Sequence, residues 1–165
     1  MKIFHIIAAC AACVGASMAL AHGSGEHAGH GGGATRASAA QMPWGTAGQA
    51  SQTSRTITLR MTDDMRFTPA HIQVRRGETL RLRVQNQGQV MHEVVLGTPV
   101  TLDEHAAAML KHPGMAHDTP YTAHVAPGQQ GDLVWNFNRA GEFDFACLIA
   151  GHYQAGMRGT IRVTP

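Results

Sequence analysis

Residues 147–157 read CLIAGHYQAGM, with a thiol at Cys147, an imidazole at His152 and a thioether at Met157. These three side chains recur at intervals of five residues within one short stretch. Copper in a blue-type site takes two imidazoles and a thiolate as strong ligands, with a thioether at a longer distance. The stretch therefore predicts a loop that supplies three ligands to a single copper ion.

The residues just before this loop predict a β-strand. Phe143, Phe145 and Cys147 alternate with other residues, and side chains two positions apart share one face of a strand. Two aromatic residues mark that face as the core side, so Cys147 should enter the site from the interior. Gly151 and Gly156 stand directly before the next two ligands and allow the backbone conformations that a tight loop needs.

A fourth ligand must come from elsewhere in the chain, and His92 is the natural candidate. It stands early in an apolar run, residues 90–96, that we expect to form a strand. His71 and His124 are the alternatives, and both should lie on solvent-facing strand positions.

Alternation with a period of two residues continues through most of residues 55–165. Turn signals such as Arg76-Gly77-Glu78 and Pro127-Gly128 separate the alternating runs. Many short strands with this spacing predict an all-β fold, a β-sandwich or small barrel. The alternating apolar residues outside the ligand region are Ile57, Leu59, Met61, Ile72, Val74, Leu80, Leu82, Val84, Leu133, Trp135, Phe137, Ile161 and Val163.

One segment breaks the β pattern and predicts a short inserted helix, about residues 102–112. Thr101 fits the N-cap of a capping box in which Glu104 reaches back. Alanine, methionine and leucine, which favour helices, follow. Pro113-Gly114 should end the helix.

From about Arg55 to Pro165 the sequence resembles the cupredoxins, the small blue-copper proteins. The resemblance rests on Phe67-Thr68-Pro69, the stretch 74–86, His92 and residues 147–159. It implies a Greek-key β-sandwich with one copper ion at one end, bound by His92, Cys147, His152 and Met157. The ligand spacing is similar to that of rusticyanin-like members, and the histidine-rich additions resemble periplasmic copper-tolerance cupredoxins.

Glu93 departs from the pattern of this family. Many electron-carrying cupredoxins have Asn directly after the first His ligand, where it braces the ligand loop beside the thiolate. Neighbours of metal ligands tune their orientation and the redox potential. We therefore expect the loop to be held differently here, and the spectrum to be green rather than pure blue.

The first residues predict export. Lys2 and an apolar run to Leu20 precede Ala19-Leu20-Ala21, which reads as a signal peptide (1–21) cleaved after Ala21. A membrane anchor and a lipoprotein site near Cys10 are the alternatives. Residues 22–54, rich in Gly, Ala, Ser, Gln and Thr, predict a disordered tail before a cupredoxin domain at 55–165.

Removal of the leader leaves Cys147 as the single cysteine, because Cys10 and Cys13 lie within it. An unpaired thiol in an oxidising compartment is buried and inert, paired with another chain, or bound to metal. Zinc is less suitable than copper, since structural zinc sites rarely use methionine.

The other histidines and methionines leave a question open. His105, Met109 and His112 share one face of the predicted helix, and Met115 and His117 follow it. They could form a weaker copper site or simply a surface helix packed on the sandwich through Met109 and Leu110. His22, His27 and His30 in the tail could collect copper or form part of a solvated linker.

The sequence pattern is compatible with three functions: copper tolerance in the periplasm, soluble electron transfer with Cu(I)/Cu(II) cycling, and catalysis. A site filled by four side chains leaves no open position for a substrate, so we expect no enzyme. The histidine-rich segments and Glu93 favour copper tolerance, with electron transfer as the alternative. Either function implies a redox or copper-transfer protein partner. With 13 basic and 11 acidic residues and no basic cluster, neither nucleic acid nor a membrane surface is indicated.

Overall fold

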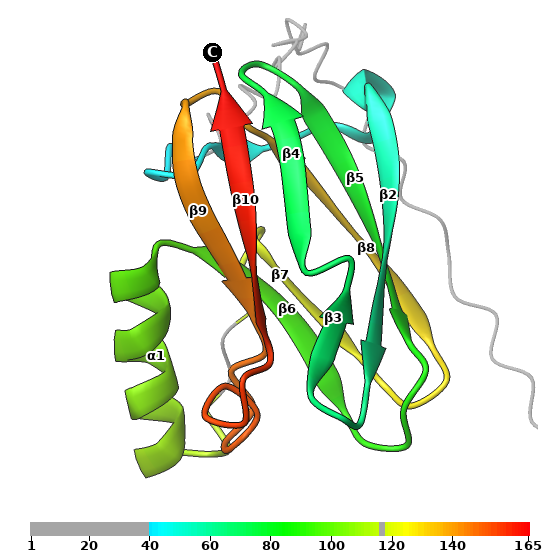
Figure 1. Ribbon diagram of the computed structural model, residues 1–165, viewed down its shortest axis with the longest axis vertical. Helices are drawn as coiled ribbons and strands as arrows, with labels where there is room; N and C mark the ends of the chain where they lie inside the picture. Colours follow the sequence, from blue (N-terminus) through cyan, green and yellow to red (C-terminus); the bar gives the residue numbers. More distant parts are fainter. Residues whose placement is uncertain (1–39, 116–117) are drawn as a thin grey trace, which may run out of the picture. The chain divides into compact units, whose positions relative to one another are not determined.

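The computed structural model describes residues 40–115 and 118–165. These residues form two five-stranded sheets and one α-helix (Figure 1). The strand order is β1-β8-β5-β2-β3 in the first sheet and β4-β10-β9-β6-β7 in the second. The elements are β1 (Thr46–Ala47), the 3₁₀ turn η1 (Ala50–Gln52), β2 (Arg55–Thr62), β3 (Arg66–Thr68), β4 (His71–Arg75), β5 (Thr79–Asn86), β6 (His92–Gly97), α1 (Pro99–Lys111), β7 (Thr122–Val125), β8 (Gln130–Asn136), β9 (Gly141–Ala146) and β10 (Arg158–Thr164).

Strand pairing in both sheets is mixed. Most neighbours are antiparallel, but β2 runs parallel to β5 and β4 runs parallel to β10. Consecutive strands such as β4 and β5 belong to different sheets, so the chain crosses repeatedly between the two layers. Crossings of this kind are typical of Greek-key sandwiches. The predicted all-β sandwich is confirmed.

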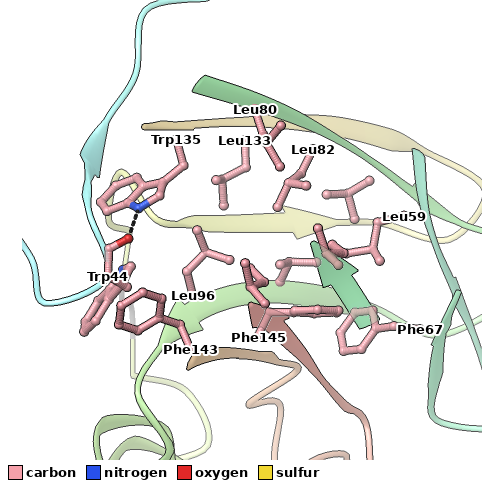
Figure 2. Packing of buried hydrophobic residues seen from close by; sticks show 14 of the residues in the cluster. Trp44, Leu59, Phe67, Leu80, Leu82, Leu96, Leu133, Trp135, Phe143 and Phe145 are labelled. Carbon is pink, nitrogen blue, oxygen red and sulfur yellow. Dashed lines mark hydrogen bonds between the residues drawn. The ribbon is translucent and has the colours of Figure 1, made fainter. Parts of the chain in front are cut away.

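The core lies between the two sheets and follows the period of two. Along β10, buried and exposed residues alternate without a break. Figure 2 shows Leu80, Leu82 and Leu133 of the first sheet facing Leu96 and Phe145 of the second. Each of these side chains is at most 3% exposed, and burying one contributes about 1.5–3 kcal/mol.

Part of the predicted tail belongs to the sandwich. Trp44 is 3% exposed, and β1 pairs with β8 as the edge strand of the first sheet. The indole N–H of Trp135 donates to the carbonyl oxygen of Trp44 at 2.9 Å (Figure 2). A strand of two residues is too short to show the alternation of apolar and polar side chains. The sequence of residues 40–54 therefore gave no sign that this segment packs on the sandwich.

The inserted helix is present, but its start differs from the prediction. Helix α1 begins at Pro99, and Thr98 is the N-cap, with its side chain accepting from the backbone N–H of Thr101. The capping box is therefore Thr98 with Thr101, three residues earlier than predicted, and the assignment of Thr101 as cap to Glu104 is wrong. Pro at the first helical position favours this start because its φ suits a helix. Its missing N–H costs nothing there, since an N–H at that position has no partner within the helix.

Helix α1 packs on the outer side of the second sheet. Its buried residues Leu102, Ala106 and Met109 recur at helical spacing and meet Val95 and Leu148 in a second apolar cluster. Leu110, by contrast, is 51% exposed, so the predicted packing of this residue is wrong. The helix thereby covers the sheet whose strands lead into the predicted ligand loop.

Candidate metal centre

The loop with three predicted ligands connects β9 to β10 beside α1 (Figure 1). The N–H of Cys147 donates to the carbonyl of Met157 at 3.0 Å, and the N–H of Met157 donates to the carbonyl of His152 at 3.1 Å. Gly151 and Gly156 have φ of 91° and 94°, in the left-handed region that favours glycine. The backbone thus curls the loop so that its first and last predicted ligands lie together at its base.

Three predicted ligands meet at this end of the sandwich. One donor atom each from His92, Cys147 and His152 lies within 4.8 Å of the other two. The Sγ of Cys147 is 3.3 Å from Nδ1 of His152, and the two imidazole centroids are 5.0 Å apart. His92 and Cys147 are fully buried, whereas His152 is half-buried.

Met157, the fourth predicted ligand, is also fully buried. It belongs to the same apolar cluster as Cys147, at the point where the loop enters β10. An unbranched thioether in this place adds a soft donor without a charge. The structure thus brings all four predicted residues to one end of the core.

The hydrogen bonding of His92 suits a metal. Its Nε2 is 3.0 Å from a carboxylate oxygen of Asp63. Its Nδ1 is buried and has no hydrogen-bond partner among the residues that the structure describes. A buried imidazole nitrogen without a partner is costly unless something binds it. Together with the thiol and the second imidazole, it forms the donor set that copper prefers.

Burial also sets the state of the thiol. Desolvation raises the pKa of Cys147 to about 12, although backbone hydrogen bonds from Glu93 and Ile149 oppose it. The cysteine is therefore a neutral thiol at pH 7 when no metal is bound. Cys147 would give up that proton on binding a metal ion, because the thiolate is the ligand.

Glu93 takes the bracing position despite being a carboxylate. It is fully buried, and its Oε1 accepts the N–H of Leu148 at 2.9 Å, directly after Cys147. Its Oε2 lies 2.8 Å from Nε2 of His124, which reaches the surface. The loop is thus tied to β6 as a bracing Asn would tie it, but through a carboxyl group that also contacts a histidine.

Replacement of Glu93 by Asn should change the colour of the copper-loaded protein. Asn can still accept the N–H of Leu148, but it is shorter and uncharged, so the loop and the thiolate relax. We expect two visible bands of comparable strength in the wild type, and a shift of their ratio towards the blue type in Glu93→Asn. Visible absorption spectra measure the ratio, with the exposed Glu142→Asn as the control. A wild-type spectrum with one dominant blue-type band would contradict this prediction.

The alternative ligands lie elsewhere. His71 is exposed on β4, with its Nδ1 2.8 Å from the hydroxyl of Thr160. His124 is 35% exposed on β7 and faces Glu93, so both histidines occupy solvent-facing strand positions as predicted. Neither belongs to the cluster of His92, Cys147 and His152.

The described histidines that could bind further copper, His105 and His112, do not belong to this cluster. Met109 is buried in the contact between α1 and the sheet, which favours a structural role, whereas His112 and Met115 are exposed. His105 is half-buried on α1. The remaining candidates, His117, His22, His27 and His30, lie outside the described residues.

Sequence reasoning missed two contacts of the site, those of Asp63 and His124. Asp63 lies in the turn between β2 and β3, and acidic residues in turns need no functional explanation. His124 was considered as an alternative ligand on a solvent-facing strand position, but its contact with Glu93, which lies opposite it on β6, was not predicted. Among residues 40–115 and 118–165, no helix has the length and apolar character needed to cross a membrane.

Comparison with known proteins agrees with this geometry. The family of copper binding proteins of the plastocyanin/azurin type matches residues 54–164. The copper-resistant cuproprotein CopI of Rubrivivax gelatinosus is 45% identical over 154 residues, 93% of each chain. CopI of Pseudomonas aeruginosa is 36% identical over 151 residues, covering 74% of this chain and 83% of the relative. The crystal structure of auracyanin B aligns with a TM-score of 0.61 at 24% identity, over 76% of this chain and all of the other, which supports the fold.

Proposed function

Because the chain belongs to the plastocyanin/azurin family of copper-binding proteins, we propose that it is a cupredoxin that binds one copper ion and serves copper tolerance. The observation that carries this proposal is the cluster of the buried His92 and Cys147 with the half-buried His152, in which Nδ1 of His92 has no partner among the described residues. The relatives named as copper-resistant cuproproteins, at up to 45% identity, support the biological role.

His92, Cys147, His152 and Met157 are the residues that would hold the ion. Copper supplies a change between Cu(I) and Cu(II), and the set serves both states because sulfur favours the first and imidazole is a good ligand for each. Burial of three of the four side chains would keep water and small molecules from the ion. We assign no catalytic reaction to the chain, since four protein ligands leave no open position for a substrate.

Electron transfer is the second candidate, and one observation favours it. His152 is only half-buried, so one ligand reaches towards the surface and could carry an electron to a protein partner. Two features favour tolerance instead: the histidine-rich segments, and the ionisable Glu93–His124 pair beside the thiolate, in place of a neutral Asn. A copper-transfer or redox protein is the partner that either role requires.

The proposed location is the periplasm. The leader pattern of residues 1–21 supports export with cleavage after Ala21, and both it and the histidine-rich residues after it lie outside the described residues. Cleavage would leave Cys147 as the single thiol, and copper coordination protects a thiol in an oxidising compartment. We propose residues 22–39 as a tail that contributes at most weak copper sites.

Growth on graded copper tests the tolerance role. A strain that lacks this protein should stop growing at lower copper than the parent strain, and a wild-type copy should restore growth. A Cys147→Ser copy should fail to restore it, because the main site is lost while the folded chain remains. A respiratory defect at ordinary copper, with unchanged copper tolerance, would favour electron transfer instead.

A further inference from the structure

A partly exposed carboxylate contacts a fully buried residue of the site. Asp63, in the turn between β2 and β3, places Oδ1 at 3.0 Å from Nε2 of His92. The His92 ring is fully buried, whereas the Asp63 side chain is 40% exposed. The contact joins the turn between β2 and β3 to the first residue of β6, 29 residues away in sequence.

The surrounding loop holds this carboxylate in place. The N–H of Gln89 donates to its other oxygen, Oδ2, at 2.7 Å. The loop itself is fixed by Asn86, which donates to the carbonyl oxygens of Val90 and Val125 at 2.8 and 2.9 Å. A Cβ atom on Gly88 would overlap with the Asp63 carboxylate, so only glycine leaves it room. Asp63 is therefore oriented before any metal arrives.

The contact between Asp63 and Nε2 of His92 determines which ring nitrogen of His92 is available to bind a metal ion. An ionised carboxylate can only accept, so Nε2 must carry the hydrogen. A neutral imidazole has one N–H, so Nδ1, which is buried and has no partner among the described residues, keeps a free lone pair. A carboxylate behind a ligating imidazole also makes that imidazole a stronger donor.

We propose that Asp63 is a positioning residue of the metal centre, which fixes His92 with Nδ1 free to bind and strengthens its donation to Cu(II). This inference rests on the proposed copper-binding function. A backbone carbonyl could orient the ring equally well, but it would not bring a negative charge. Asp63 therefore adds a preference for Cu(II) over Cu(I) to the orientation.

Replacement of Asp63 by Ala should weaken copper binding by about 10- to 100-fold, the usual cost of losing a partner behind a ligand. It should also raise the reduction potential, because the charge that favours Cu(II) is gone. Asp63→Asn should raise the potential while losing less affinity, since an amide oxygen can still accept from Nε2. Asp64→Ala is the matched control: it removes an exposed carboxylate of the same turn that does not contact His92. Competition with copper chelators and voltammetry measure the two effects.

The metal-free protein gives an independent test. Nitrogen NMR of the histidine rings should show His92 entirely with hydrogen on Nε2 in the wild type and in Asp64→Ala, and as a mixture in Asp63→Ala. Gly88→Ala keeps the carboxylate but displaces it, so it should give the same mixture and a weaker copper affinity.

Two results would overturn the inference. One is an affinity and potential of Asp63→Ala that match those of Asp64→Ala. The other is a metal-free His92 that keeps its hydrogen on Nε2 without Asp63. If the wild type bound no copper through Cys147, the proposed function would fail instead, and the NMR comparison would still decide the role of Asp63 towards His92.

Discussion

The Cys147→Ser protein should bind copper without any intense visible colour. A Cu(II)–thiolate bond absorbs strongly because an electron moves from sulfur to copper, and a serine hydroxyl offers no comparable donor at neutral pH. Copper affinity should also fall sharply, because one of the three strong ligands is lost. Visible absorption of the copper-loaded wild type and variant measures the difference directly.

The fold should survive this substitution. Serine is close to cysteine in size, and burial of a hydroxyl costs about 1–3 kcal/mol, which a sandwich of this size can tolerate. The alternating core residues of β9 and β10 are unchanged. Far-ultraviolet circular dichroism of both proteins is the control. Visible colour that persisted in folded Cys147→Ser would show that the site has been assigned to the wrong residues.

Replacement of Trp44 by Ala should lower the free energy of unfolding by about 3 kcal/mol, within the usual range for a buried Trp. Its ring packs edge-on against Tyr121 with centroids 5.3 Å apart. The indole N–H of Trp44 is buried and unpartnered within the described residues, so its removal offsets part of the loss. The carbonyl that accepts from Trp135 is backbone and remains.

Urea unfolding followed by fluorescence measures this effect, with the exposed Gln52→Ala as the control. Gln52 lies in the turn that follows β1, so its replacement changes the same segment without removing a core side chain. Equal stability of Trp44→Ala and Gln52→Ala would mean that residues before Arg55 do not support the sandwich.

The sequence predicted those parts of the structure that depend on local patterns. Strands such as β10 appear where single apolar residues alternate, because one face of each strand is buried between the sheets. The ligand loop was predicted because Cys147, His152 and Met157 lie within one stretch. Copper binding by a cupredoxin was likewise predicted and is confirmed by the family match.

Contacts between distant segments could not be predicted in this way. Asp63 meets His92 only because the fold brings the turn after β2 to the start of β6. Trp44 is a single aromatic residue among small and polar neighbours, and only its burial against Tyr121 distinguishes it. The helix start was misplaced because Thr98 and Thr101 are both suitable caps, and Pro99 after the first was the overlooked signal.

X-ray absorption at the copper edge of the loaded wild-type protein tests the ligand set most directly. The account predicts two imidazole ligands and one short copper–sulfur bond from Cys147, with the short sulfur contribution absent in Cys147→Ser. Met157 should add only a weak, longer sulfur contribution. A wild-type spectrum with nitrogen and oxygen ligands alone would contradict the proposed centre of His92, Cys147, His152 and Met157.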